Sequence, residues 1–151
     1  WHPTWNPEGP EIAFISNISG DPEIYAQDSE GNSRQLTDND YYDADPDWSP
    51  NGRYIVFSSD PTALTPDAEL NTDLYVVKPD GSDLQQITDL EGFELEPTWS
   101  SDSSNILFTG NLEGNVEVYL LRGDGSVFGV TANSAVDSVP SWAPMTTSSD
   151  Q

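Results

Sequence analysis

Short apolar runs separated by polar, turn-forming stretches extend along the whole chain, and one stretch shows the arrangement most clearly. Asp43–Asp60 begins with an extended P-x-W segment, continues through a Ser-Pro-Asn-Gly turn and ends in an apolar run, Tyr54–Phe57. Pro50 and Gly52 suit the turn, because proline fixes φ at its first corner and glycine accepts a positive φ. The continuous apolar run is typical of a strand that is covered on both faces.

This pattern recurs at intervals of roughly 40 to 50 residues, and a repeat of that period decides the fold. The P-x-W motif stands at four places, Pro3/Trp5, Pro46/Trp48, Pro97/Trp99 and Pro140/Trp142. A phenylalanine follows each of the first three, namely Phe14, Phe57 and Phe108. A tyrosine in a second apolar run comes next, at Tyr25, Tyr75 and Tyr119. Each unit then ends on an apolar-threonine pair, Leu36-Thr37, Ile87-Thr88 or Val130-Thr131.

Each unit contains four short extended segments and no helical period; in the second unit they are roughly 45–48, 53–59, 72–78 and 84–88. A four-stranded antiparallel meander repeated in this way is the blade of a β-propeller. The sequence therefore predicts an all-β fold with three four-stranded blades plus the first strand of a fourth, an incomplete ring. Because neighbouring blades bury their faces against each other, the aromatic repeat positions are predicted to form the inter-blade core: Trp5, Phe14, Tyr25, Trp48, Phe57, Tyr75, Trp99, Phe108, Tyr119 and Trp142.

The predicted blades occupy residues 1–42, 43–93 and 94–136, with the further first strand at 137–144 and a flexible tail at 145–151. A polar insertion around 61–71 is expected to lengthen one hairpin loop of the second blade. Closed propellers typically need about four to eight blades. The chain is therefore expected to be a fragment, a processed product or a protomer that completes its ring with other chains.

The motif P-x-W-S-P-x-G-x-x-I-x-F, followed by the spaced tyrosine, glycine and apolar-threonine pair, resembles the TolB-type propeller repeat. That repeat also occurs in propellers of tricorn-like and prolyl-oligopeptidase-like peptidases. The resemblance covers about residues 3–142, and the second unit fits it best, whereas Ser100–Ser103 of the third lacks both proline and glycine. It implies a propeller fold and an extracytoplasmic location. It leaves the function open, because members of the family bind proteins, bind glycans or gate an active site.

The charge balance excludes several partners. Acidic residues number 27 against four basic ones, which gives a formal net charge of −23. The four cations, Arg34, Arg53, Lys78 and Arg122, form no cluster in the sequence, so nucleic acid and anionic membrane surfaces are not expected partners. No apolar run reaches a membrane-spanning length. High salt or calcium would relieve the self-repulsion of such a chain, although a generic acidic surface explains the composition equally well.

Alternating carboxylates suggest one candidate metal site. Asp43, Asp45 and Asp47 follow a D-x-D-x-D pattern, and Glu94 and Glu96 stand at the corresponding place in the third unit. Carboxylate oxygens are the ligands that calcium prefers, so these residues are candidate calcium ligands. The glycine and distal glutamate of an EF-hand loop are missing, and a row of carboxylates on one face of a strand is also an ordinary solvated surface. No other cofactor is expected.

No catalytic motif stands out. The sequence has no G-x-S-x-G motif, no cysteine and a single histidine, His2, which is expected to be a surface residue. No carboxylate pair suited to glycoside cleavage is distinguished from the repeat. Stacking of tryptophans on sugars is disfavoured because all but Trp1 occupy the repeated P-x-W position. The chain is therefore not expected to be an enzyme by itself.

Three functional hypotheses remain. The first is a non-catalytic extracellular binding or assembly module, whose partner is a protein: further copies of the chain or the remainder of a larger propeller. The second is the propeller portion of a secreted peptidase or glycan-active enzyme with its catalytic domain elsewhere. The third is a structural subunit of a filament or surface layer.

Overall fold

The computed structural model describes residues 3–62 and 70–143, and these form strands and turns without a helix. Trp1, His2, most of the predicted insertion and the predicted tail lie outside the described residues. The first sheet contains β1 (Thr4–Trp5), β2 (Ile12–Ser16), β3 (Glu23–Gln27) and β4 (Ser33–Gln35). The second contains β5 (Tyr42–Trp48), β6 (Ile55–Asp60), β7 (Asp73–Val77) and β8 (Gln85–Gln86). The third contains β9 (Glu94–Trp99), β10 (Asn105–Gly110), β11 (Glu117–Arg122) and β12 (Val127–Gly129).

Within each sheet the strands follow one another as an antiparallel meander. The repeat phenylalanine and tyrosine are direct cross-strand partners in all three sheets. Their rings stack with centroid separations of 6.1 Å (Phe14–Tyr25), 5.9 Å (Phe57–Tyr75) and 5.6 Å (Phe108–Tyr119). The repeat therefore places equivalent residues at equivalent positions, and the prediction of three four-stranded blades is confirmed.

The predicted turns also form. Gly52 has φ +65° and its N–H donates to the Ser49 carbonyl, closing the Ser-Pro-Asn-Gly turn. In the third unit, Ser103 adopts φ 60° at the equivalent corner and donates to the Ser100 carbonyl in the same way. The turn is thus kept without glycine, with a side chain in a backbone region that only glycine adopts freely.

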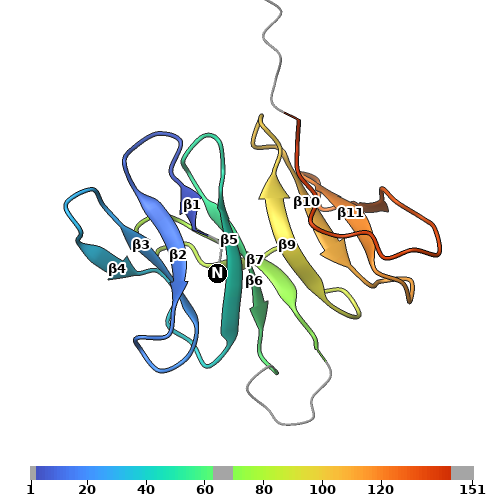
Figure 1. The fold of residues 1–151 in the computed structure, drawn as a ribbon, viewed down its shortest axis with the longest axis horizontal. Coiled ribbons are helices and arrows are strands. Elements are labelled where there is room, and N and C mark those ends of the chain that lie inside the picture. Colours follow the sequence, from blue (N-terminus) through green and yellow to red (C-terminus); the bar gives the residue numbers. More distant parts are fainter. Residues whose placement is uncertain (1–2, 63–69, 144–151) are drawn as a thin grey trace, which may run out of the picture.

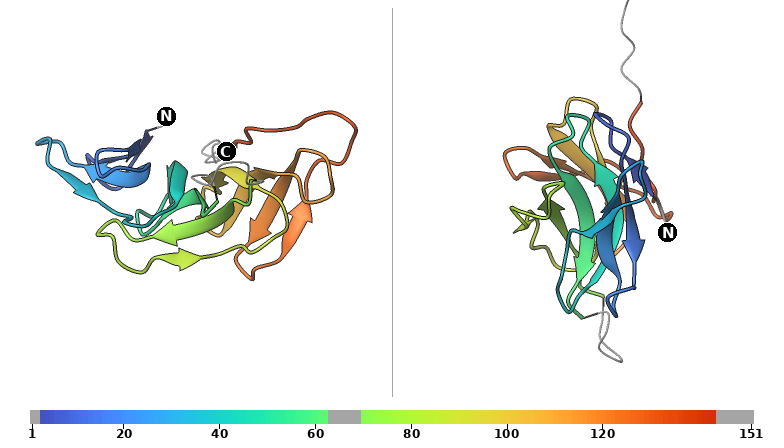
Figure 2. Two further views of the ribbon diagram at one scale, coloured as in Figure 1. Left: turned by 90° about the horizontal axis from the view of Figure 1, so that it is seen from below. Right: turned by 90° about the vertical axis from the view of Figure 1, so that its left-hand side faces the viewer.

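The three sheets fan out along an open arc, with the first, second and third sheets in order (Figures 1 and 2). The first strands of the sheets, β1, β5 and β9, lie on the concave side and contact one another in sequence. The chain after β12, residues 130–143, returns along the third sheet toward this side (Figure 2). The predicted first strand of a fourth blade, 137–144, is described as far as residue 143, and this part pairs with no strand among the described residues.

Two apolar cores hold adjacent sheets together. Between the first and second sheets, Trp48 and Phe57 (3% and 1% exposed) pack with Ala13, Ile24 and Leu36. Between the second and third, Phe108 is fully buried, and the half-buried Trp99 packs beside it against residues of the second sheet. In each junction, the tryptophan of one sheet therefore contacts the preceding sheet.

This rule explains the largest departure from the predicted core. Trp5 is 73% exposed, because within the described residues no sheet precedes the first one to cover it. Phe14, on the same face, is only half-buried for the same reason. Tyr75, Trp99 and Trp142 are also half-buried, whereas Tyr25 and Tyr119 are buried as expected.

Candidate functional site: the inner groove and the blade junctions

A groove of about 270 Å³ runs across the inner strands on the concave side. Its polar lining comes from the carboxylates and hydroxyls of Thr4, Asp45, Asp47, Glu96 and Thr98. The prolines of all four P-x-W motifs line it as well. The groove thus brings together parts of units that are far apart in the sequence.

An irregular backbone precedes three of these prolines, Pro46, Pro97 and Pro140. Asp45, Glu96 and Val139 have φ values of 50°, 53° and 55°, and all three line the groove. At Asp45 and Glu96 the pairing register shifts, as in a β-bulge. Left-handed non-glycine residues are costly, and their occurrence at the same repeat position marks a shared feature of the inner strands.

The middle residue of the P-x-W motif links neighbouring blades. The Thr4 hydroxyl donates to Asp47 Oδ1 over 3.3 Å and accepts from the Trp48 N–H over 3.5 Å. In the next junction, the Trp99 N–H donates to Asp47 Oδ2 over 2.9 Å. Burial raises the pKa of Asp47 despite these donors. Both carboxylate oxygens of Asp47 therefore already have partners within the protein.

Asp43 lies instead in a buried acid pair at the first junction. Its carboxylate is fully buried and accepts from the Ser59 hydroxyl over 2.5 Å and from Asn39 Nδ2 over 3.1 Å. Glu23, also fully buried, accepts from the Thr37 hydroxyl and from the Asn39 N–H. Desolvation raises the pKa of both carboxyls, that of Glu23 to about 7.

The second junction repeats this pair with the two side-chain lengths exchanged. Asp73 takes the position of Glu23, and Glu94 takes that of Asp43. The Thr88 hydroxyl donates to Glu94 Oε2 over 2.6 Å, while Glu94 Oε1 is buried without a hydrogen-bond partner. Burial raises the pKa of Glu94 to about 7. Each junction thus contains one glutamate and one aspartate, which come from different blades.

At the end of the third sheet, Glu117 and Asp137 form the corresponding arrangement. Glu117 accepts from the Thr131 hydroxyl and the Asn133 N–H, and Asn133 Nδ2 donates to Asp137 over 2.5 Å. The hydrogen bond from Thr131 is the main reason that the pKa of Glu117 is lowered. The segment that follows the third sheet is therefore held by the same kinds of hydrogen bond as the segment that connects the first blade to the second.

The five candidate calcium ligands thus divide into two groups. Asp43 and Glu94 belong to separate buried pairs, whereas Asp45, Asp47 and Glu96 line the inner groove. Among the residues that the structure describes, no group of three or more histidine, cysteine or acidic side chains is arranged to hold a metal ion. Glu96 Oε2 accepts from the Thr109 hydroxyl and the Val139 N–H. Calcium binding stays a prediction.

Sequence reasoning missed the partners of these acids. Glu23, Asp73 and Glu117 each stand two residues before the repeat tyrosine, so a signal was present in the repeat. The repeated threonine was recognised only as the end of each unit. Its hydroxyl in fact accepts from a backbone N–H of the third strand and donates to an acid in all three units.

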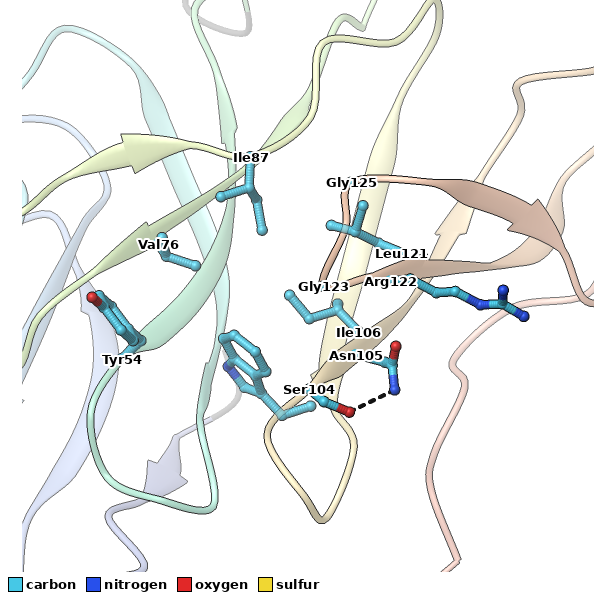
Figure 3. Close-up of a pocket in the computed structure, with 11 residues that line it drawn as sticks. Tyr54, Val76, Ile87, Ser104, Asn105, Ile106, Leu121, Arg122, Gly123 and Gly125 are labelled. Carbon is cyan, nitrogen blue, oxygen red and sulfur yellow. Dashed lines mark hydrogen bonds between the residues drawn. The ribbon is translucent and has the colours of Figure 1, made fainter.

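An apolar pocket of about 320 Å³ lies between the second and third sheets and is lined by Tyr54, Val76, Ile87 and Leu121 among others (Figure 3). At the first junction, Arg34 bridges the two sheets instead. Its guanidinium binds Glu11 at 2.8 Å and donates to the Pro79 carbonyl at 2.8 Å. Gln85 and Gly123 stand at the positions of Arg34 and Pro79 in the second junction, so the bridge is missing there and the space stays open. The pocket has the size and lining to hold an apolar side chain.

Meandering four-stranded sheets that fan around a concave inner groove define a β-propeller architecture. Comparison with known families agrees with this class. The model of the TolB beta propeller domain matches residues 3–148, and the chain belongs to this family.

Individual relatives show the same likeness. A protein described as "Protein TolB homolog" from Chlorobium chlorochromatii is 36% identical over 142 residues, which cover 90% of this chain and 29% of the relative. The uncharacterized peptidase YuxL of Bacillus subtilis is 29% identical over 117 residues, covering 73% of this chain and 17% of that protein. The chain thus spans less than a third of the length of these relatives.

A solved structure, that of a putative TolB from Agrobacterium tumefaciens, superimposes with a TM-score of 0.74 at 26% identity. The match covers 87% of this chain and 48% of the other chain. The predicted resemblance to the TolB propeller repeat is therefore confirmed in both sequence and fold.

Proposed function

We propose that this chain is a non-catalytic protein-binding and assembly module of an extracytoplasmic TolB-like propeller. One observation carries the proposal: the outer face of the first sheet, the face that points away from the second sheet, is more exposed than the equivalent faces of the other two sheets. Trp5 is 73% exposed, whereas Trp48, its equivalent in the second sheet, is 3% exposed. Ile12 and Phe14 on the same face are half-buried, whereas their equivalents Ile55 and Phe57 are buried. An aromatic and aliphatic face of this kind usually marks a protein interface.

The side chains in the concave groove support a binding role rather than catalysis. Asp47 has both oxygens engaged by neighbouring blades, and Glu96 already accepts two hydrogen bonds. Asp43 and Glu94 are fully buried at the blade junctions and do not line the concave groove. With no cysteine in the sequence and one histidine, there is no evident nucleophile and base.

The extracytoplasmic location rests on the family likeness and on the strong acidity of the chain. A net charge of −23 keeps the protein soluble and disfavours anionic partners. In the part of the chain that the structure describes, no helix is long and apolar enough to cross a membrane.

Two other functions remain as alternatives. The relationship to a protein described as a peptidase favours the propeller portion of a hydrolase, whose catalytic residues would lie outside this chain. The open arc of blades favours a structural subunit of a filament or surface layer. A coding sequence that continues into a Ser/His/Asp domain would support the first of these.

Footprinting with hydroxyl radicals on the native particle tests the proposed function. Phe14 should be protected there and reactive in the denatured chain, because a protein partner covers the outer face of the first sheet. Phe57, buried within the chain, serves as the internal control for folding. Equal reactivity of Phe14 in the native particle and in the isolated, dilute chain would contradict a binding role for this face.

A further inference from the structure

The two blade junctions use the same repeat positions, but only the first is closed at the end of the blades that carries the outer turns. There, Arg34 of the first sheet binds Glu11 and donates to the Pro79 carbonyl of the second sheet. The second junction has Gln85 in the place of Arg34, so it has no cation to form the bridge. The pocket of about 320 Å³ between the second and third sheets lies where this bridge is missing.

Two equivalent turn glycines show the same difference independently. Gly81 and Gly125 have φ values of 82° and 84° in the last turns of the second and third units. A Cβ added to Gly81 would lie 3.4 Å from the Leu36 carbonyl oxygen of the preceding sheet. A Cβ added to Gly125, which lines the pocket, would meet no described atom within 4 Å apart from its neighbours in the chain. The opening is therefore a feature of the whole junction end and not of one side chain.

Apolar side chains form the walls of the pocket. Val76 and Ile87 come from the second sheet and its last strand end, and Ile106 and Leu121 come from the third sheet (Figure 3). Trp99 also lines the pocket and is half-buried, whereas its equivalent in the closed first junction is buried. Water in such a space gains little from its surroundings, so an apolar group would replace it favourably.

The polar side chains that line the pocket already have partners. The Ser104 hydroxyl accepts from Asn105 Nδ2 and donates to Asp102 Oδ1, each over 2.7 Å. The Arg122 guanidinium lies 4.3 Å from the centroid of the Phe128 ring, and Figure 3 shows that it points away from the pocket. Sites for small molecules usually direct several polar groups at the ligand to fix its orientation. This lining suits instead an apolar side chain that a larger partner holds in place.

Two carboxylates stand on the turns beside the pocket. Asp102 lies on the turn between β9 and β10, and Asp124 lies on the turn between β11 and β12. Hydrogen bonds from the Ser100 and Ser104 hydroxyls lower the pKa of Asp102 to about 2, and a hydrogen bond from the Ser126 hydroxyl lowers that of Asp124. Both residues are exposed. The third-sheet rim of the pocket is therefore anionic at neutral pH.

We propose that this pocket binds an apolar side chain of a protein partner in which lysine or arginine residues flank that side chain. The apolar side chain fills the space that the Arg34 bridge closes at the first junction, and the flanking cations pair with Asp102 and Asp124. The net charge of −23 favours such a partner, because it attracts cations from the surrounding solution. The pocket is separate from the outer face of the first sheet and adds a second binding surface to the proposed function.

Titration with a peptide, followed through the tryptophan indole signals by nuclear magnetic resonance, tests the site. The probe is the acetylated and amidated tripeptide Lys-Phe-Lys, added into the millimolar range at physiological ionic strength. It should shift the indole N–H signal of Trp99, which lines the pocket. The signal of Trp48, at the same position of the closed first junction, should stay unchanged and reports that the fold is intact.

Two further peptides separate the apolar anchor from the charge. Lys-Ala-Lys has the same charges without the anchor and should bind more than about tenfold more weakly, because the burial of the phenylalanine side chain is lost. Asp-Phe-Asp keeps the anchor with reversed charges and should also bind more weakly. Equal affinity of Lys-Ala-Lys would contradict an apolar anchor in the pocket, and equal affinity of Asp-Phe-Asp would contradict a cationic partner.

The first junction supplies the design of a variant that closes the pocket. Tyr54 and Gln85 stand at the positions of Glu11 and Arg34, so Tyr54→Glu/Gln85→Arg introduces the same ion pair without changing the net charge. The new guanidinium can donate to the Gly123 carbonyl, the equivalent of the Pro79 carbonyl. The variant should lose the response of Trp99 to Lys-Phe-Lys. An unchanged response in a folded variant would overturn the proposed site.

A second pair of variants tests the carboxylates. Asp102→Asn/Asp124→Asn keeps the Oδ1 acceptors of both turns and should weaken binding of Lys-Phe-Lys by about two- to tenfold, as expected for two exposed ion pairs. Glu8→Gln/Glu30→Gln removes two charges at the same repeat positions of the first blade and should leave the affinity unchanged. Equal weakening in the two variants would mean that net charge attracts the peptide, and would overturn the pairing with Asp102 and Asp124.

This inference and the proposed function fail separately. A Trp99 signal that does not respond to Lys-Phe-Lys overturns the pocket site, while protection of Phe14 in the native particle still supports binding through the first sheet. A reactive Phe14 contradicts that face as an interface and leaves the result at the pocket unaffected.

Discussion

At the scale of single residues, the buried acids between the blades are the most unusual feature. Glu94 is fully buried with one oxygen unpartnered, and burial raises its pKa from 4.5 to about 7. The folded protein therefore binds a proton at Glu94 more tightly than the unfolded chain does. By linkage, the contribution of Glu94 to the free energy of unfolding is greatest below about pH 4.5 and falls as pH rises to about 7.

Glu94→Gln should remove this dependence, because the amide mimics the protonated acid. We expect the variant to be more stable than the parent at pH 8 and of similar stability at pH 4, as measured by urea unfolding. Glu91→Gln, which removes the same charge from an exposed residue, is the matched control. If both variants shift stability equally, net charge rather than the buried carboxyl governs the pH dependence.

Calcium is the second prediction at this scale. The groove carboxylates Asp45, Asp47 and Glu96 are the candidates that share one surface, whereas Asp43 and Glu94 face the junctions. A specific ion stabilises the folded state by mass action, so millimolar calcium should raise the melting temperature above that in sodium chloride of equal ionic strength. Asp45→Asn/Glu96→Gln should abolish the difference. Identical melting curves in the two salts would leave charge screening as the only effect.

At the scale of elements, the repeated tryptophan has two different roles that depend on its neighbour. Trp48→Ala should lower the free energy of unfolding by about 3–5 kcal/mol, the usual cost for a large aromatic in a core. Trp5→Ala, at the equivalent but exposed position, should change it by less than about 0.5 kcal/mol. Urea unfolding of both variants at low protein concentration, where association does not contribute, measures the contrast. Equal losses would mean that Trp5 is also buried in solution.

The sequence was sufficient to predict the strands because all of its repeated features indicate the same four-stranded unit. Turn residues, the Phe–Tyr pair and the P-x-W motif recur in the same order, and β6 and β7 lie close to the expected 53–59 and 72–78. The period alone could not tell that Trp5 is exposed, because burial depends on a neighbouring sheet and not on the motif. The acid pairs were missed because their members come from different strands, so that Glu23 and Asp43 meet only once the blades are side by side.

The identity of a single turn residue predicted the turn less well than the strands on either side of it. Ser103 takes the left-handed corner that Gly52 occupies in the second unit, although the third unit lacks the favoured residues. The strand pairs on either side, β9 with β10 and β10 with β11, set the position of this corner. The long pairing therefore overrides the local preference of the turn.

At the scale of the whole molecule, the described residues form three blades, and apolar cores of the same kind join the first blade to the second and the second to the third. Trp5, Ile12 and Phe14 lie on the face of the first sheet that no other described sheet covers. The family likeness explains the blades. The proposed assembly role rests on this aromatic and aliphatic face.

Static light scattering of the purified chain at high ionic strength tests this central claim most directly. An assembly role predicts a particle heavier than the 16.5 kDa chain, which dissociates on dilution. A folded particle of 16.5 kDa that unfolds cooperatively and keeps its mass across the accessible concentration range would contradict it.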